Sequence, residues 1–198
     1  MRLPKLVRDS RKGLEKEIQT LPSGFYDSFE YTRAGKNLTH PRTLGCIVKV
    51  LLGFDSVKAV DIDIRMNIGR VRFQPDIQVI GTDDTPILFI DYESPNSSDA
   101  RIPRKDVLPY LKLGRPIPYI VITTLPDAPK AKWKTRVYPS SASRNRGRVR
   151  QKIRESPRRF WYNNYRHELK KLKNRLDSVY FFNIDGKKVM VAPLFKKT

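Results

Sequence analysis

Two apolar runs, separated by a segment long enough for a helix, constrain the fold of this chain more than any other feature. The first spans residues 86–93 and contains Ile87-Leu88-Phe89-Ile90, and the second spans residues 117–124. Apolar runs without polar alternation are typical of strands covered on both faces, and two such strands joined through a helix favour a parallel crossover. We therefore expect a mixed α/β (α+β) domain with helices flanking a central sheet, residues 86–93 at the centre of that sheet, and a helix within residues 97–114.

Weaker patterns place further elements before these runs. A polar start and an end before Pro22 predict a helix over residues 9–20, and apolar residues at helical spacing predict another over residues 41–52. Alternating apolar residues predict strands over residues 57–66 and 70–80. Pro75 lies inside the last of these strands and cannot donate a hydrogen bond to a ladder. We therefore expect a bulge or a local kink at this proline.

The C-terminal third of the chain differs in composition. Residues 127–156 are rich in Pro, Ser, Lys and Arg and have no apolar period, which indicates a loop or an arm. An apolar stripe at helical spacing predicts an amphipathic helix over residues 157–176. The pair Asp185-Gly186 between two apolar segments predicts a hairpin whose strands span residues 179–184 and 188–194.

Composition excludes several classes of protein and of site. The chain has 198 residues, and Cys46, His40 and His167 are its only cysteine and histidines. An internal disulfide and a zinc site built from paired Cys or His ligands are therefore excluded, so a bound metal would need oxygen ligands. Neither a membrane-spanning run nor the apolar core of a signal peptide is visible, and we expect an intracellular protein, cytoplasmic or nucleoid-associated, without a membrane partner.

Basic charge is concentrated in one part of the chain. The formal net charge is +20, and residues 130–175 alone hold 17 basic and 2 acidic side chains. A net charge of about 2 to 8 is enough to keep a small domain soluble, so this concentration favours a polyanionic partner, above all nucleic acid. We expect a core over residues 1–128 and a basic C-terminal part over residues 129–198, in which the hairpin packs on the core. The predicted phosphate contacts are Arg144, Arg146, Arg148, Arg150, Lys152, Arg166, Lys170 and Lys173.

Three carboxylates form the candidate site. Asp91 and Glu93 are two residues apart on a predicted strand, so both point to the same face beside an apolar run. A hairpin without a bulge places Asp76 opposite Ile90, whereas a one-residue bulge at Pro75 or in the loop places it opposite Asp91. Facing carboxylates repel, so this arrangement is unfavourable unless a cation or a shared proton is present. Mg²⁺, which prefers oxygen ligands, would relieve the repulsion, and Mn²⁺ is the expected substitute. The alternative is a set of unrelated surface carboxylates at strand ends.

A lysine follows these acids in the predicted helix. Lys105 comes 14 residues after Asp91 and is expected near the carboxyl end of the strand. An ammonium group there would position an attacking water or stabilise the charge that develops on a phosphorane. The alternative is that Lys105 is one of many basic residues on a solvated surface.

These residues resemble a known family. Phe73-Gln74-Pro75-Asp76-Ile77, followed by Ile90-Asp91-Tyr92-Glu93, resembles the bipartite motif of the PD-(D/E)xK nuclease superfamily, whose core is a mixed four-stranded sheet flanked by helices. Residues 73–124 are most similar to the Uma2-type branch. The residues that carry this similarity are Pro75-Asp76, Asp91, Ser94-Pro95, Lys105 and Tyr110.

The resemblance implies a restriction-endonuclease-like core and a metal site. Asp76, Asp91 and the Tyr92 carbonyl would bind the metal, and Glu93 would bind metal or orient water. Glu93 occupies the position where the superfamily usually has Lys, and Lys105 would supply that lysine from the following helix. A glutamate from the first helix often joins the site in this superfamily. The eligible residues here are Glu15 and Glu17.

The sequence therefore predicts a Mg²⁺-dependent DNA endonuclease that acts on double-stranded DNA. Cutting both strands symmetrically would require a homodimer, because one such centre cuts one strand at a time. The alternative is a non-catalytic nucleic-acid-binding protein derived from a nuclease fold, and a third interpretation is a structural protein of a nucleoprotein particle.

Overall fold

A computed structural model describes most of the predicted core and the C-terminal hairpin. The described residues are 3–21, 39–68, 70–93, 107–114, 117–125, 177–185 and 187–191. The predicted arm (residues 127–156), the predicted helix (residues 157–176) and Lys105 lie outside this part. All eight predicted phosphate contacts also lie outside it, so those predictions are untested.

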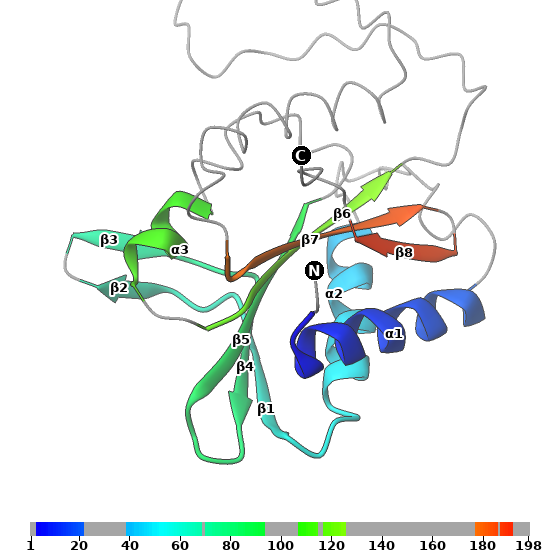
Figure 1. Ribbon diagram of the computed structural model, residues 1–198, viewed down its shortest axis with the longest axis horizontal. Helices are drawn as coiled ribbons and strands as arrows, with labels where there is room; N and C mark the ends of the chain where they lie inside the picture. Colours follow the sequence, from blue (N-terminus) through cyan, green and yellow to red (C-terminus); the bar gives the residue numbers. More distant parts are fainter. Residues whose placement is uncertain are drawn as a thin grey trace, which may run out of the picture.

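The described residues form a six-stranded sheet in which the two apolar runs are adjacent and central (Figure 1). β5 has the bounds expected from the sequence, and it pairs in parallel with β6, which confirms the predicted crossover. β6 also pairs in parallel with β7, whereas the other neighbours are antiparallel. In spatial order the strands are β1 (Val57–Ile62), β4 (Ile77–Gly81), β5 (Pro86–Glu93), β6 (Tyr119–Leu125), β7 (Val179–Asp185) and β8 (Lys188–Val191).

Helices cover both faces of this sheet, as Figure 1 shows. On one face, α1 (Lys5–Thr20) and α2 (Thr39–Leu51) bury apolar side chains against the sheet. On the other face, the short helix α3 (Leu108–Lys112) packs with the small sheet of β2 (Met66–Ile68) and β3 (Val71–Phe73). Each face therefore has its own apolar core, and the fold is mixed α/β with a central sheet between layers, as predicted.

Two predicted strands differ from the expectation: one is shorter, and the other is divided between two sheets. The strand predicted over residues 57–66 ends at Ile62, because Asp63 has a positive φ of 57° that ends the extended backbone. The strand predicted over residues 70–80 is divided into β3 and β4, with Pro75 buried in the connection. The proline therefore marks the passage from one sheet to the other, which corrects the expectation of a bulge within one strand.

The helix boundaries also differ from the prediction. α1 begins at Lys5, four residues before the expected start, because Pro4 leads into the helix and its carbonyl accepts a hydrogen bond from the Arg8 N–H at 2.9 Å. Of the helix predicted within residues 97–114, the described part contains α3, with Pro109 in its first turn, where proline is tolerated.

The C-terminal hairpin is confirmed, with Asp185 paired to Lys188 next to the turn. Its two strands, β7 and β8, join the central sheet as its last two strands rather than lying on the surface of the core. No helix in the described ranges is both long enough and apolar enough to cross a membrane.

Two helical glycines give a matched test of how closely α1 approaches α2. A Cβ at Gly13 would lie 2.5 Å from Val50 Cγ1, whereas a Cβ at Gly45 would meet no atom within 4 Å. We expect Gly13→Ala to destabilise the protein, because overpacking costs about 1–3 kcal/mol against a gain of about 1 kcal/mol in helix propensity. Gly45→Ala should stabilise it by about 0.5–1 kcal/mol. Urea unfolding of both variants measures the difference.

The double variant Gly13→Ala/Val50→Ala tests the cause, because shortening Val50 makes room for the new methyl group. It should lose less free energy of unfolding than the two single changes added together. Equal effects of Gly13→Ala and Gly45→Ala would contradict close packing of the two helices at this point.

Candidate functional site

A one-residue bulge in the β4–β5 hairpin brings Asp76 and Asp91 together. Ile80 pairs with Pro86, but the register shifts between Val79 and Ile80, so that Ile77 pairs with Ile90. Continuing this register by one residue places Asp76 opposite Asp91. Of the two arrangements that the sequence left open, the structure therefore has the one in which the two aspartates face each other.

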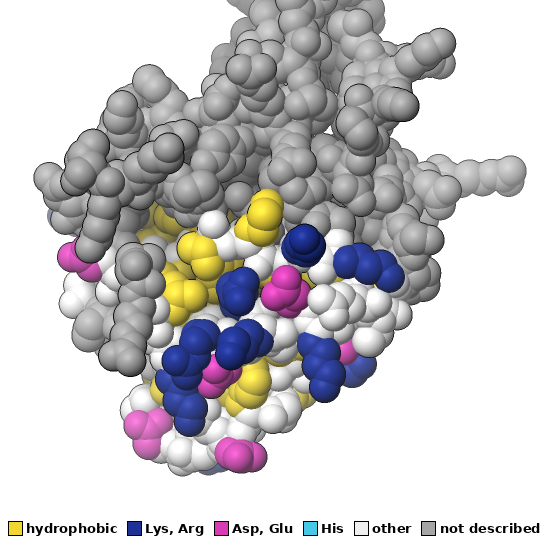
Figure 2. Space-filling view, turned by 45° about the vertical axis from the view of Figure 1, so that its right-hand side comes forward, with side chains coloured by type: hydrophobic (Ala, Val, Ile, Leu, Met, Phe, Trp, Pro, Cys, Tyr) yellow, Lys and Arg dark blue, Asp and Glu magenta, His cyan; other side chains and the backbone are white. Residues whose placement is uncertain are grey.

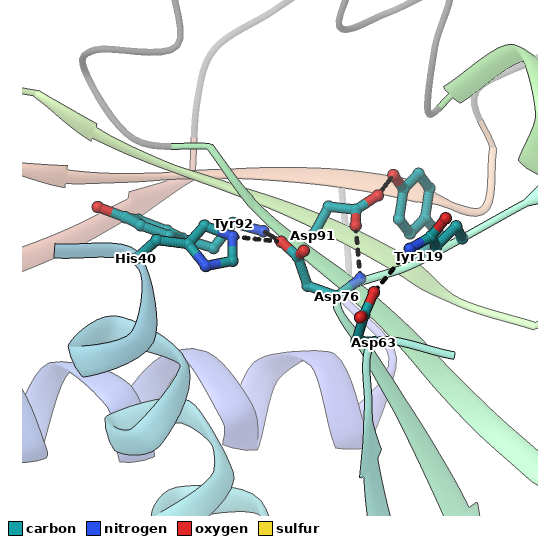
Figure 3. Close-up of polar contacts among 7 residues, drawn as sticks. His40, Asp63, Asp76, Asp91, Tyr92 and Tyr119 are labelled. Atoms are coloured by element: carbon teal, nitrogen blue, oxygen red, sulfur yellow. Dashed lines mark hydrogen bonds and ion pairs between the residues drawn. The ribbon is translucent and has the colours of Figure 1, made fainter. Parts of the chain in front are cut away.

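Each aspartate accepts a hydrogen bond from the backbone of the opposite strand segment (Figure 3). The Asp76 N–H donates to Asp91 Oδ1 at 2.8 Å, and the Tyr92 N–H donates to Asp76 Oδ2 at 2.8 Å. These reciprocal bonds extend the β4–β5 pairing to Asp76, which comes just before the start of β4. They also place partial positive charge beside both carboxylates, which reduces the repulsion between them.

Asp91 is buried and has a second donor. Asp91 is only 4% exposed, and the hydroxyl of the fully buried Tyr119 donates a hydrogen bond to its Oδ2. Phe89 pairs with Tyr119, and Asp91 pairs with Val121, so the parallel register of β5 and β6 puts the phenol on the same face as the carboxylate. A buried carboxylate needs such donors, because an unpaired charge in an apolar environment is costly.

Asp76 has a more exposed position and a histidine partner. Its side chain is 27% exposed, and His40 Nε2 lies 3.2 Å from Asp76 Oδ2. His40 is the second residue of α2, and its ring packs at a tilt against the ring of Tyr92, with centroids 5.6 Å apart. The start of α2 therefore reaches the aspartate pair from the side opposite Tyr119, as Figure 3 shows.

The connection that follows β1 fixes the backbone of Asp76. The Asp63 N–H donates to the Asp76 carbonyl at 2.9 Å, and Gln74 Nε2 donates to Asp63 Oδ1 at 2.6 Å. The left-handed conformation of Asp63 directs its N–H toward Asp76, and aspartate tolerates this conformation better than most residues. Asp63 and Gln74 thus hold the segment that presents Asp76.

Aromatic rings enclose the Asp91 side of the site. Tyr119 stacks at a tilt on Tyr110, with centroids 4.7 Å apart, and meets the edge of Phe73 at 5.6 Å. Burial raises the pKa of the Tyr110 phenol, so its hydroxyl stays protonated and donates to the Ile117 carbonyl. The low polarity of this cluster strengthens the hydrogen bonds that Asp91 receives.

Three other predicted site residues are not seen at the aspartate pair. The side chain of one lies outside the described part of the chain, and the other two bind elsewhere. Glu93 is the last residue of β5 and pairs with Thr123, but its side chain lies outside the described part of the chain. Glu17 binds Lys49 at 2.7 Å, and Glu15 lies 3.8 Å from Arg11. Since Lys49 is nine residues after His40 on α2, Glu17 is bound about 13 Å along the helix from the site.

The donor set of the aspartate pair fits a hard cation. In the described ranges, no group of three or more His, Cys, Asp and Glu side chains is arranged to hold a metal ion. Mg²⁺ needs fewer protein ligands, because one or two carboxylates with water can complete its shell. Among the described residues, the hydrogen bonds to the Asp76 carboxylate go to Oδ2, which leaves Oδ1 as a possible metal ligand. The atoms that would bind the metal are all oxygens.

Sequence reasoning missed three residues that shape the site: His40, Asp63 and Tyr119. His40 gives no signal of its own, because nothing in the sequence shows that the start of α2 lies beside Asp76. Asp63 follows an alternating strand, where aspartate commonly marks a chain reversal. Tyr119 is a polar group within an apolar run, which is the pattern that could have identified it.

Comparison with protein-family models, curated proteins and solved structures finds no match for this chain.

The hydrogen bond from Tyr119 predicts a specific loss of stability. Tyr119→Phe removes a donor to a buried carboxylate, and we expect the free energy of unfolding to fall by about 1.5–3 kcal/mol. Tyr110→Phe is the matched control, because it removes a hydrogen bond to a neutral carbonyl and should cost only about 1 kcal/mol. Urea unfolding at pH 7 compares them. A smaller loss for Tyr119→Phe than for Tyr110→Phe would contradict the role of this phenol.

Proposed function

We propose that this protein is a Mg²⁺-dependent DNA endonuclease that hydrolyses phosphodiester bonds, with a restriction-endonuclease-like core. One observation carries the proposal: Asp76 and Asp91 face each other where β4 begins and β5 ends, within a network that holds both carboxylates in place. The mixed arrangement of β1, β4, β5 and β6, with helices on both faces, agrees with the core expected from the motif resemblance.

The metal would be held by Asp76, Asp91 and the Tyr92 carbonyl. When bound, Mg²⁺ supplies a water of lowered pKa and neutralises charge on the phosphodiester. Asp91 would act from a rigid position, because the Asp76 N–H and the Tyr119 hydroxyl fix both of its oxygens. Asp76 is partly exposed, and within the described part of the chain its hydrogen bonds go to Oδ2, so Oδ1 would be its metal ligand.

Two further residues belong to this proposal through their place in the sequence. Glu93 comes two residues after Asp91 in the sequence, and under this proposal it would bind metal or orient water. Lys105 would stabilise the developing charge and replace the lysine that the superfamily usually has at the position of Glu93. The basic segment over residues 130–175 would hold the duplex by contacts with its phosphates.

A second candidate function, binding of nucleic acid without cleavage, is favoured by a different observation. Asp91 already receives hydrogen bonds from a backbone amide and from a buried phenol, so the carboxylate is satisfied as a structural element. An inactive relative of a nuclease would retain this network while losing the reaction. The net charge of +20 serves either function equally.

Cleavage of supercoiled plasmid in the presence of Mg²⁺ tests the proposal. The wild-type protein should nick or linearise the plasmid, and EDTA should abolish the reaction. Asp76→Asn and Asp91→Asn should each reduce the rate by about 100-fold or more, equivalent to roughly 2.7 kcal/mol in the barrier. Gel electrophoresis over a time course measures the rates.

Asp84→Asn is the matched control, because Asp84 is an exposed aspartate in the β4–β5 turn and its positive φ of 62° is tolerated by asparagine. It should cut at the wild-type rate. If Asp91→Asn does not fold, the cleavage rate of Asp76→Asn tests the proposal, since the Asp76 side chain is partly exposed. DNA binding without cleavage by the wild-type protein would establish the second candidate function.

His40 provides a further prediction for the same reaction. A group that hydrogen-bonds to a metal-ligating carboxylate typically contributes 10- to 100-fold to metal affinity or activity, at order of magnitude. We expect His40→Ala to slow cleavage by about tenfold and to raise the Mg²⁺ concentration needed for half-maximal rate. An unchanged Mg²⁺ dependence would show that His40 does not position Asp76.

A further inference from the structure

The exposed face of α1 carries a continuous row of cations. The first four exposed residues of this helix are Lys5, Arg8, Lys12 and Lys16, and each is followed by the next after three or four positions. Residues at these separations are neighbours on one helix face. We call this row the α1 stripe. In the sequence it is distinct from the basic segment over residues 130–175.

The positions of the charged residues on α1 lower the stability of the helix. Its first turn contains no acidic residue, and its last turn contains no basic residue, although the macrodipole favours the opposite placement. Arg8, Lys12 and Lys16 also form like-charged pairs at i,i+4, which destabilise helices. A row that only kept the helix soluble would not need this order, so the arrangement points to an external anion.

The acidic residues of α1 pair with only one cation of the stripe among the described residues. Glu15 lies near Arg11 and Glu17 binds Lys49, neither of which is in the stripe. Asp9 lies 3.3 Å from Arg8, and this is the one ion pair that the stripe makes within the described residues. Figure 2 shows Lys and Arg side chains predominating over acidic ones on the side of the molecule turned toward α1 and α2.

The geometry of the stripe fits a phosphate backbone. From Lys5 to Lys16 the helix rises about 16 Å, a length over which one strand of a duplex presents about five phosphates. A membrane surface fits less well, because interfacial helices expose large apolar side chains beside their cations. The apolar side chains Val7, Leu14 and Ile18 are instead buried in the core, and no large apolar residue of α1 is exposed.

We propose that the α1 stripe is a second contact surface for the backbone of double-stranded DNA. The inference concerns binding alone and does not depend on cleavage, so it stands or falls separately from the nuclease proposal. The surface would add electrostatic contacts to those of the basic C-terminal segment. Its contribution should be independent of base sequence, because its cations meet phosphates only.

Neutralisation of the stripe tests the proposal. The variant K5Q/R8Q/K12Q/K16Q and the control K58Q/R65Q/R70Q/K112Q each remove four exposed cations and keep side chains of similar length. Binding of the full-length protein to a fluorescein-labelled duplex is measured by anisotropy in EDTA, which excludes cleavage, over a series of salt concentrations. The stripe variant should bind at least about tenfold more weakly at low salt, and its salt slope should fall by about 3.

Two controls make the outcome decisive. Equal losses in the stripe and control variants would overturn the proposal, since net charge alone would then explain the binding. A loss of binding to anionic phospholipid vesicles without a loss of binding to the duplex would also overturn it, in favour of a lipid surface. Without DNA the stripe variant should melt at or above the wild-type temperature. If the stripe variant melted several degrees below the wild-type protein, poorer folding would explain its weaker binding, and the proposal would be overturned.

Discussion

The buried carboxylate of Asp91 is the constraint on which the arrangement of this site depends. An aspartate that is 4% exposed needs hydrogen-bond donors, and three different segments of the chain supply or orient them. The backbone of Asp76 and the phenol of Tyr119 donate directly, while the amide beside Asp91 binds Asp76 in return. The charge therefore ties the start of β4 and the start of β6 to the end of β5.

The sheet was largely predictable because its central strands are defined by local sequence. β5 and β6 each contain an apolar run of four or more residues, and the helix between them makes a parallel pairing the simple solution. The division of residues 70–80 between two sheets was not predictable, since apolar alternation looks the same whichever sheet a strand joins. The pairing of β6 with β7 depends on contacts between segments separated by residues 126–178, and no local pattern encodes such a contact.

The candidate site was predictable where its residues share one hairpin, and not where it depends on tertiary contact. Asp76 and Asp91 belong to strands joined by a short turn, so only the position of a bulge was open. Tyr119 and His40 reach the aspartates through a parallel register and through the placement of a helix. Neither relation can be obtained from spacing along the chain. The expectation that facing carboxylates need a cation or a shared proton overlooked the donors that the backbone itself provides.

The parallel pairing of β5 with β6 also determines where the most basic part of the chain is anchored. Thr123 of β6 lies beside Glu93, and β6 ends two residues later at Leu125. Residue 130, the first of the basic segment, is five residues further on and can be at most about 18 Å from that anchor. Under the proposed function, DNA bound at the start of the basic segment would therefore already be near the acids.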